Sequence, residues 1–137
     1  MRWTIFWIVA IAAILWNLFG LYDFLETVSH NPDYMKKIPP DMLAWIQTLP
    51  TWRWAAWGVG VVASVAASLA LLLRRAVAQP LFWVTVAVMV LVFAHDLLLD
   101  EGMRVMGAAF PVMLVVVEAL FALYARWAAG QGMLKRP

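Results

Sequence analysis

Four long apolar stretches constrain this chain more than any other feature of its sequence. They cover about residues 4–25, 54–73, 81–99 and 105–124. Each is long enough to cross the ~30 Å hydrocarbon core of a bilayer, because a helix needs roughly 20 residues for that distance. A lone strand in lipid would leave its backbone groups unpaired, so helix is the expected conformation. The sequence therefore predicts an all-α membrane protein, a bundle of four transmembrane helices.

The composition agrees with a lipid environment. Of the 137 residues, 66% are apolar and 13% are charged, whereas soluble domains have about 45–50% apolar and about 25% charged residues. The length predicts a single domain that covers residues 1–137. The chain has no cysteine, which excludes disulfides, thiolate catalysis and cysteine-ligated metals.

The first apolar stretch is predicted to stay in the membrane as a helix. A cleavable signal peptide would carry small residues after its apolar core. Here that region holds the bulky side chains of Trp16, Leu18, Phe19 and Leu21. We therefore interpret this stretch as an uncleaved signal anchor.

The distribution of basic residues predicts that both termini lie in the cytoplasm. An excess of Lys and Arg in short loops marks the cytoplasmic side of a membrane protein. Six basic residues fall on the side of the termini and four on the opposite side. The six are Arg2, Arg74, Arg75, Arg126, Lys135 and Arg136, and the four are Lys36, Lys37, Arg53 and Arg104.

Seven of the eight acidic residues fall on the predicted outer side, and these are Asp23, Glu26, Asp33, Asp41, Asp96, Asp100 and Glu101. Acidic residues contribute little to topology, so their asymmetry indicates chemistry or partners on the outer face. The chain has no basic patch with interleaved aromatic residues, which is why a nucleic-acid partner is not expected.

The longest loop, residues 26–53, is predicted to lie outside and to contain a short helix at about 40–48. Four tryptophans in this loop and just after it, Trp45, Trp52, Trp54 and Trp57, cluster near the predicted membrane border. Tryptophan favours the headgroup zone, so one interpretation is an interfacial helix that anchors the bundle. The alternative is an aromatic lid over an outward-facing cavity.

Small residues in the second stretch predict a close helix contact. Ala56, Gly60, Ser64 and Ser68 recur every four residues, and such a surface lets another helix approach closely in lipid. The pattern does not distinguish a contact within the chain from one between chains. In the fourth stretch, Gly107 and Pro111 predict a bend that opens space next to Glu118.

Two polar residues lie within the predicted spans and are candidate binding or packing groups. Asn17 is expected to hydrogen-bond across helices. Glu118 falls near the bilayer centre, where an acid costs at least ~2.5–3.5 kcal/mol and must face the protein interior. Three interpretations remain open for Glu118: a protonated acid hydrogen-bonded to a group such as Ser64 or Ser68, a proton-coupled or ligand-binding group, and an interface with another membrane protein.

A second candidate site is a polar cluster at the outer border. Asp23, Glu26 and His30 share one helix face, and His95 and Asp96 end the third stretch close to Asp100.

Solvated helix ends, with ion pairs to Arg53 or Arg104, are the first interpretation of this outer cluster. A vestibule for a polar substrate and a divalent metal site are the alternatives, since imidazole and carboxylate are common metal ligands. His95 and Asp96 are about 100° apart on a helix, so we do not expect one to orient the other.

Catalysis is not expected of this chain. It has no GxSxG, HExxH, P-loop or dinucleotide-binding motif. We therefore predict a protein that is not an enzyme and that needs no metal or cofactor.

The segments LWNLFGLYDFL, LPTWRWAAWGVGV and SLALLLRRAVAQPLF resemble parts of a family of small four-span bacterial membrane proteins, some of which are labelled sugar transporters. The resemblance covers about residues 10–95 and is carried by hydrophobic sequence. It implies a bacterial inner-membrane location and a four-helix plan. The chain differs from the small multidrug exporters, whose essential membrane acid is on the first span, because Glu118 is on the fourth.

Two classes of function follow. The first is a non-catalytic accessory subunit or binding module that packs against lipid and another membrane protein, or against itself. The second is a small-solute transporter or channel component that acts as an oligomer, with Asn17 and Glu118 lining the route. Four helices leave little room for an enclosed aqueous path, so the first class is favoured.

Overall fold

The computed structural model describes residues 1–135, which form seven helices and no strand. Four of the helices are long and apolar enough to span a membrane: α1 (Arg2–Val28), α4 (Thr51–Leu72), α5 (Ala78–Leu98) and α7 (Ala109–Gly130). Three are short: α2 (Pro32–Met35), α3 (Pro40–Gln47) and α6 (Gly102–Met106). The predicted all-α bundle of four spans is confirmed.

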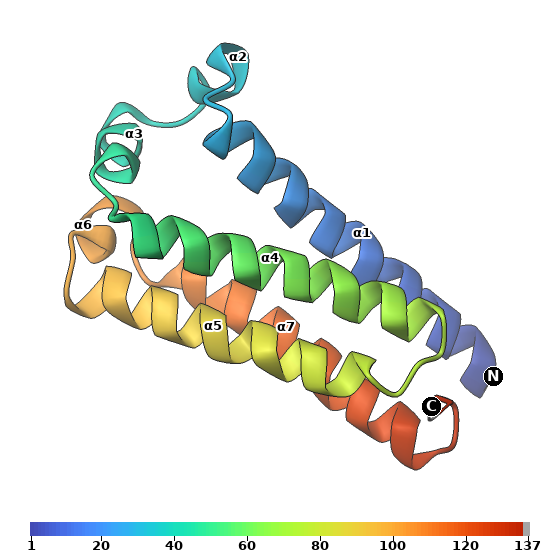
Figure 1. The fold of residues 1–137 in the computed structure, drawn as a ribbon. Helices are drawn as coiled ribbons and strands as arrows, with labels where there is room; N and C mark the ends of the chain where they lie inside the picture. Colours follow the sequence, from blue (N-terminus) through green and yellow to red (C-terminus); the bar gives the residue numbers. More distant parts are fainter. Residues whose placement is uncertain (136–137) are drawn as a thin grey trace.

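The long helices pack mainly against their neighbours in chain order. Helix α4 contacts both α1 and α5, and α5 also packs against α7. Helices α1 and α7 meet near the chain termini, where the rings of Phe6 and Tyr124 lie 6.5 Å apart. Figure 1 shows both termini at one end of the bundle, here called the terminal end, and α2, α3 and α6 at the other, the loop end.

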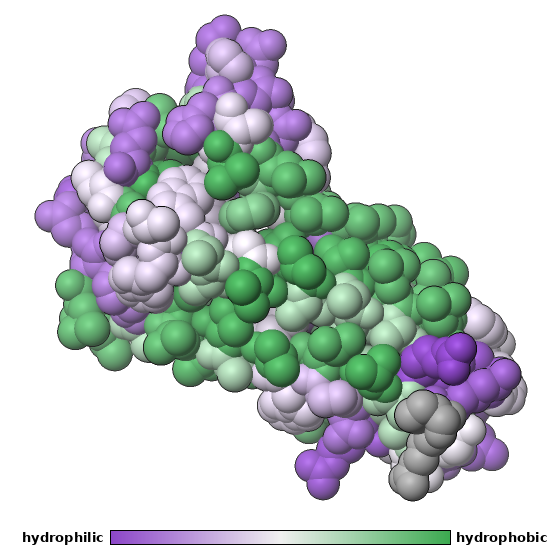
Figure 2. Space-filling view, in the orientation of Figure 1, coloured by the Kyte–Doolittle hydropathy of each residue, from purple (hydrophilic) through white to green (hydrophobic). Residues whose placement is uncertain are grey.

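Large apolar side chains cover the outside of the bundle, as lipid contact requires. Figure 2 shows a broad apolar band between polar groups at the two ends. The interior of the terminal half is built from alanines together with Phe6, Leu71 and Phe82, all fully buried. Small side chains allow the helix backbones to approach, because lipid supplies no hydrophobic force that brings helices together.

The loop between α1 and α4 folds onto the loop end. Helix α3 lies in the segment where the sequence predicts a short helix, and it packs against α6. Trp45, Ile46 and Leu49 are buried there against Val105 and Met106. The loop end therefore has a small apolar core of its own.

The last span differs from its predicted limits. Helix α7 begins at Ala109 rather than near 105, because Gly107 ends α6 with a φ of +69°, a conformation open mainly to glycine. Pro111 lies in the first turn of α7, where a missing N–H removes no helical hydrogen bond. The predicted bend at these two residues thus falls before and at the start of α7, not beside Glu118.

The terminal end is closed by backbone pairing. The N–H of Ala76 donates to the carbonyl of Lys135 at 3.0 Å, and the N–H of Lys135 donates to the carbonyl of Arg74 at 2.6 Å. Arg74 has a φ of +58°, which turns the chain between α4 and α5. The segment after α7 therefore lies against the α4–α5 turn.

Candidate functional site

A buried polar group joins α1 to α4 in the middle of the bundle. The amide Nδ2 of Asn17 donates to Ser68 Oγ at 2.9 Å. The Ser68 hydroxyl in turn lies 2.9 Å from the Ser64 carbonyl. Asn17, Ser64 and Ser68 are at most 4% exposed. The structure thus contains the interhelical hydrogen bond expected of Asn17.

Glu118 lies in α7 beside this group, and its side chain is fully buried. The Asn17 amide approaches its carboxyl group, but neither carboxyl oxygen has a hydrogen-bond partner. Ser64 and Ser68 do not supply one, because their hydroxyls donate to backbone carbonyls, Ser64 Oγ to Val61 at 2.8 Å. Ser64 and Ser68 are therefore not its partners, and the interpretation of Glu118 as a hydrogen-bonded acid that holds the bundle together stays a prediction.

The small residues of α4 pack against other helices of the same chain. A Cβ atom on Gly60 would lie 3.3 Å from Val88 Cγ1 of α5, and one on Gly58 would lie 3.1 Å from the ring of Phe24 in α1. Gly60 and Ser68 of the predicted stripe thus contact α5 and α1, respectively, and Gly58 adds a second contact with α1. This resolves the choice between a contact within the chain and one between chains at these glycines.

Arg53 and Asp96 form an ion pair beneath the loop end, between α4 and α5. Arg53 Nε lies 3.0 Å from Asp96 Oδ1, and Nη2 lies 2.6 Å from Oδ2. Arg53 is 5% exposed and Asp96 is fully buried. The sequence interpretation of solvated helix ends named Arg53 as a partner, but it is wrong about solvation because this pair is enclosed.

Close backbone packing encloses Asp96. A Cβ atom on Gly102 would lie 2.5 Å from the Asp96 carbonyl oxygen, so only glycine fits at this position without a backbone shift. The neighbouring His95 also contacts the pair, with Nδ1 3.3 Å from Asp96 Oδ1. The expectation that one of these residues would not orient the other is wrong, since Asp96 reaches the imidazole along the helix surface. Trp52 packs edge-on against the His95 ring at 4.7 Å.

Asp100 connects the α5–α6 turn to the long loop, because its Oδ2 accepts a hydrogen bond from Trp45 Nε1 at 3.2 Å. Side-chain oxygens and nitrogens of His95, Asp96 and Asp100 lie within 4.8 Å of one another, the spacing of a possible metal site. However, Asp96 is already paired with the Arg53 guanidinium, and Asp100 already accepts a hydrogen bond from Trp45. A cation is disfavoured beside a buried guanidinium, so this donor set fits a metal poorly.

The polar residues that follow α1 form a separate group. The Tyr34 hydroxyl donates to Asp23, and the Asn31 amide donates to Glu26. Burial and the Asp23 carboxylate raise the pKa of the Tyr34 phenol, which therefore remains a donor. His30 is exposed, and within the described chain its ring bonds only to the carbonyl of Val28. Across residues 1–135, no hydrogen bond or ion pair joins this group to His95 or Asp96.

Comparison of the chain with known protein families, with curated proteins and with solved structures finds no match. The four apolar helices nevertheless show that the chain has the architecture of a multi-pass integral membrane protein in contact with lipid.

Proposed function

We propose that the chain is a non-catalytic accessory subunit that docks another membrane protein at its loop end. The observation that carries this proposal is the closed interior of the bundle. Asn17, Ser64, Ser68 and Glu118 would line a solute route, yet each is at most 4% exposed. Two surface pockets of the described chain, one between the start of α1 and the segment after α7 and one between α5 and α7, are lined by other residues.

The loop end has the properties of a docking platform. Helix α3 packs directly on α6 through apolar side chains, and the Trp45–Asp100 hydrogen bond fixes it to the α5–α6 turn. The Arg53–Asp96 pair holds α4 and α5 together just beneath. These contacts hold α3 in a defined position at the loop end (Figure 1).

The charge of the platform indicates the chemistry of its partner. Acidic residues outnumber basic ones on this side of the chain, and Asp33, Asp41 and Glu101 are exposed. Two of these acids pair with basic neighbours, Asp33 with Lys36 and Glu101 with Arg104. The remaining excess of negative charge favours a partner that presents basic side chains.

Native mass spectrometry after extraction in mild detergent would test this proposal. We expect a complex of fixed stoichiometry for the wild type and for Arg126→Glu, a charge reversal at the terminal end. The double variant Asp33→Lys with Asp41→Lys changes exposed side chains only and should release the partner. A chain that is monomeric or self-associated in all three samples would contradict the docking role.

A small-solute transporter component is the second candidate, and the buried carboxyl of Glu118 favours it. An ionisable group inside a membrane protein is expensive and marks ion or proton pathways in pumps and transporters. Solute uptake driven by a pH gradient into liposomes, lost in Glu118→Gln and kept in Ser64→Ala, would support this candidate. Absence of uptake by the wild type would leave docking as the favoured function.

The location that we propose is the bacterial inner membrane, with both termini in the cytoplasm. The resemblance of residues 10–95 to four-span bacterial proteins supports the inner-membrane location. The excess of basic residues at the terminal end supports the cytoplasmic position of both termini.

A further inference from the structure

The terminal end carries positive charge without any acidic residue to balance it. Its basic residues in the described chain are Arg2, Arg74, Arg75, Arg126 and Lys135. Seven acidic residues lie at the loop end, and the eighth, Glu118, lies in the middle of α7. Figure 2 shows strongly polar side chains where the apolar band ends on this side. The described chain thus places no acidic side chain at this end to compete for an anionic ligand.

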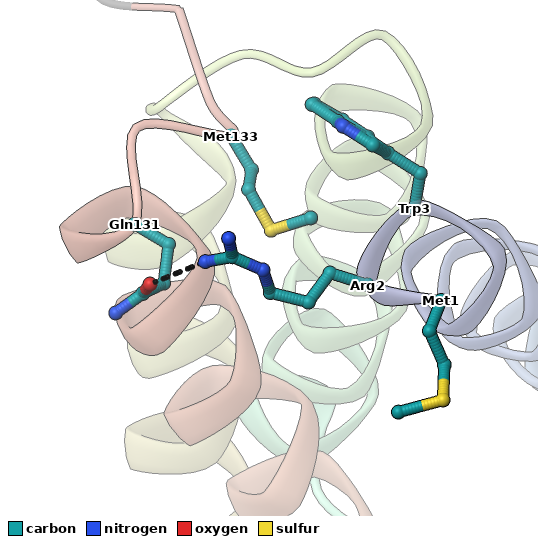
Figure 3. A pocket seen from close by; sticks show the side chains of 5 residues that line it. All are labelled: Met1, Arg2, Trp3, Gln131 and Met133. Carbon is teal, nitrogen blue, oxygen red and sulfur yellow. Dashed lines mark hydrogen bonds between the residues drawn. The ribbon is translucent and has the colours of Figure 1, made fainter.

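A pocket of about 280 Å³ opens at this end, between the start of α1 and the segment after α7. It is lined by Met1, Arg2, Trp3, Gln131 and Met133. Figure 3 shows the Arg2 side chain extending from α1 below Met133 toward Gln131. Its Nη1 donates to Gln131 Oε1 at 3.2 Å, so one of the five guanidinium N–H donors is used in this bond.

The guanidinium of Arg74 contacts two of the residues that line the pocket. The Cζ atom of Arg74 lies 4.4 Å from the centre of the Trp3 ring, and its Nε donates to the Met133 carbonyl at 3.0 Å. Two lining residues are thus held in place by Arg74. The pocket therefore has a fixed wall, an additional positive charge and no competing carboxylate.

Exposed tryptophans near the pocket indicate that it lies at the depth of lipid headgroups. Trp3, Trp7 and Trp127 surround this end of the bundle and are 42–46% exposed, and indole rings favour the membrane interface. A ligand here therefore meets both the guanidinium groups and the edge of the acyl layer. Arginine binds phosphate through parallel N–H donors, and basic pockets at helix ends bind phospholipid headgroups.

We propose that this pocket binds the phosphate of an anionic phospholipid, with Arg2 as its main donor and the Gln131 amide as a second. Binding would fix the start of α1 to the segment after α7 through one headgroup. The inference is independent of the loop end and of the proposed docking role.

The test is lipid binding by the purified full chain, measured by native mass spectrometry with phosphatidylglycerol. We expect Arg2→Gln to weaken binding about five-fold, the factor expected for one basic side chain at an anionic lipid surface. Gln131→Glu places a carboxylate against Arg2 at an exposed position and should weaken binding at least as much. Arg126→Gln removes the same charge from the same end outside the pocket, and it should change binding less than two-fold.

Two further ligands separate the pocket from general charge attraction. Phosphatidylcholine carries a phosphate with no net negative charge and should bind more weakly than phosphatidylglycerol. Inorganic phosphate at the same concentration should not displace the lipid. Equal weakening by Arg2→Gln and Arg126→Gln, or displacement by inorganic phosphate, would overturn the proposal.

Discussion

Arg53 and Asp96 form a two-point ion pair between α4 and α5 that is almost completely removed from solvent. The two residues are 43 positions apart in the chain. A buried pair of this kind costs desolvation energy but fixes the relative position of the helices that carry it.

Removing one member of this pair should strongly destabilise the bundle. Arg53→Met leaves the Asp96 carboxylate buried without a counterion, and we expect the free energy of unfolding to fall by about 3–5 kcal/mol. The double variant Arg53→Met with Asp96→Leu removes both charges and should recover most of this loss. Denaturant unfolding in detergent measures both, and equal stability of wild type and Arg53→Met would show that the pair is solvated.

Gly60→Leu should destabilise the contact between α4 and α5. The new side chain would meet Val88, which already lies 3.3 Å from the position of a Cβ atom at residue 60. Overpacking of this kind costs typically 1–3 kcal/mol.

Thermal unfolding in detergent would measure this loss. Val62→Leu is the matched control, because Val62 lies on the same helix and is exposed, so it should leave the melting temperature unchanged. Adding Val88→Ala to Gly60→Leu should restore part of the stability. If Gly60→Leu behaves like the control, Gly60 faces lipid.

Replacing Glu118 by an apolar residue of similar length should stabilise the protein. Neither carboxyl oxygen has a well-formed hydrogen bond, and the Asn17 amide that approaches the carboxyl keeps its bond to Ser68, so Glu118→Met removes a desolvation penalty of roughly 1–3 kcal/mol. Glu118→Gln keeps a buried polar group and should change stability less. Both variants are compared with the wild type by denaturant unfolding. A large loss of stability in Glu118→Met would reveal a partner that forms in lipid.

The topology has a direct test. The excess of basic residues on the side of the termini predicts that Pro137 lies in the cytoplasm and that residues 31–40 lie outside. A reporter that is active only in the periplasm should therefore be silent after Pro137 and active within 31–40. The reverse pattern would invert the orientation of the whole bundle.

Hydrophobic sequence predicts the spans of this fold well, because lipid demands long apolar helices whatever their neighbours are. Individual contacts depend on tertiary structure and are predicted less well. The sequence offers Arg53 and Arg104 as partners for the outer acids, and only the packing of α4 on α5 selects Arg53 for Asp96. No local pattern links Trp45 to Asp100, since 55 residues separate them.

The polar residues inside the bundle also show that contacts are harder to predict from the sequence than spans. Hydropathy identifies Asn17 and Glu118 as polar residues that must face inward, and the structure places both in the interior. Which of them obtains a hydrogen bond depends on the rotation of each helix about its axis. Asn17 donates to Ser68, whereas the Glu118 carboxyl is only approached by the same amide, and no single-sequence pattern distinguishes the two cases.

The pairing of Lys135 with the α4–α5 turn also bears on biogenesis. Lys135 is synthesised after α4 and α5, so the turn between these helices lacks the two backbone hydrogen bonds of Lys135 while the hairpin is being made. The turn is completed only when synthesis has passed α7. These contacts of the bundle therefore form only after the last span has been made.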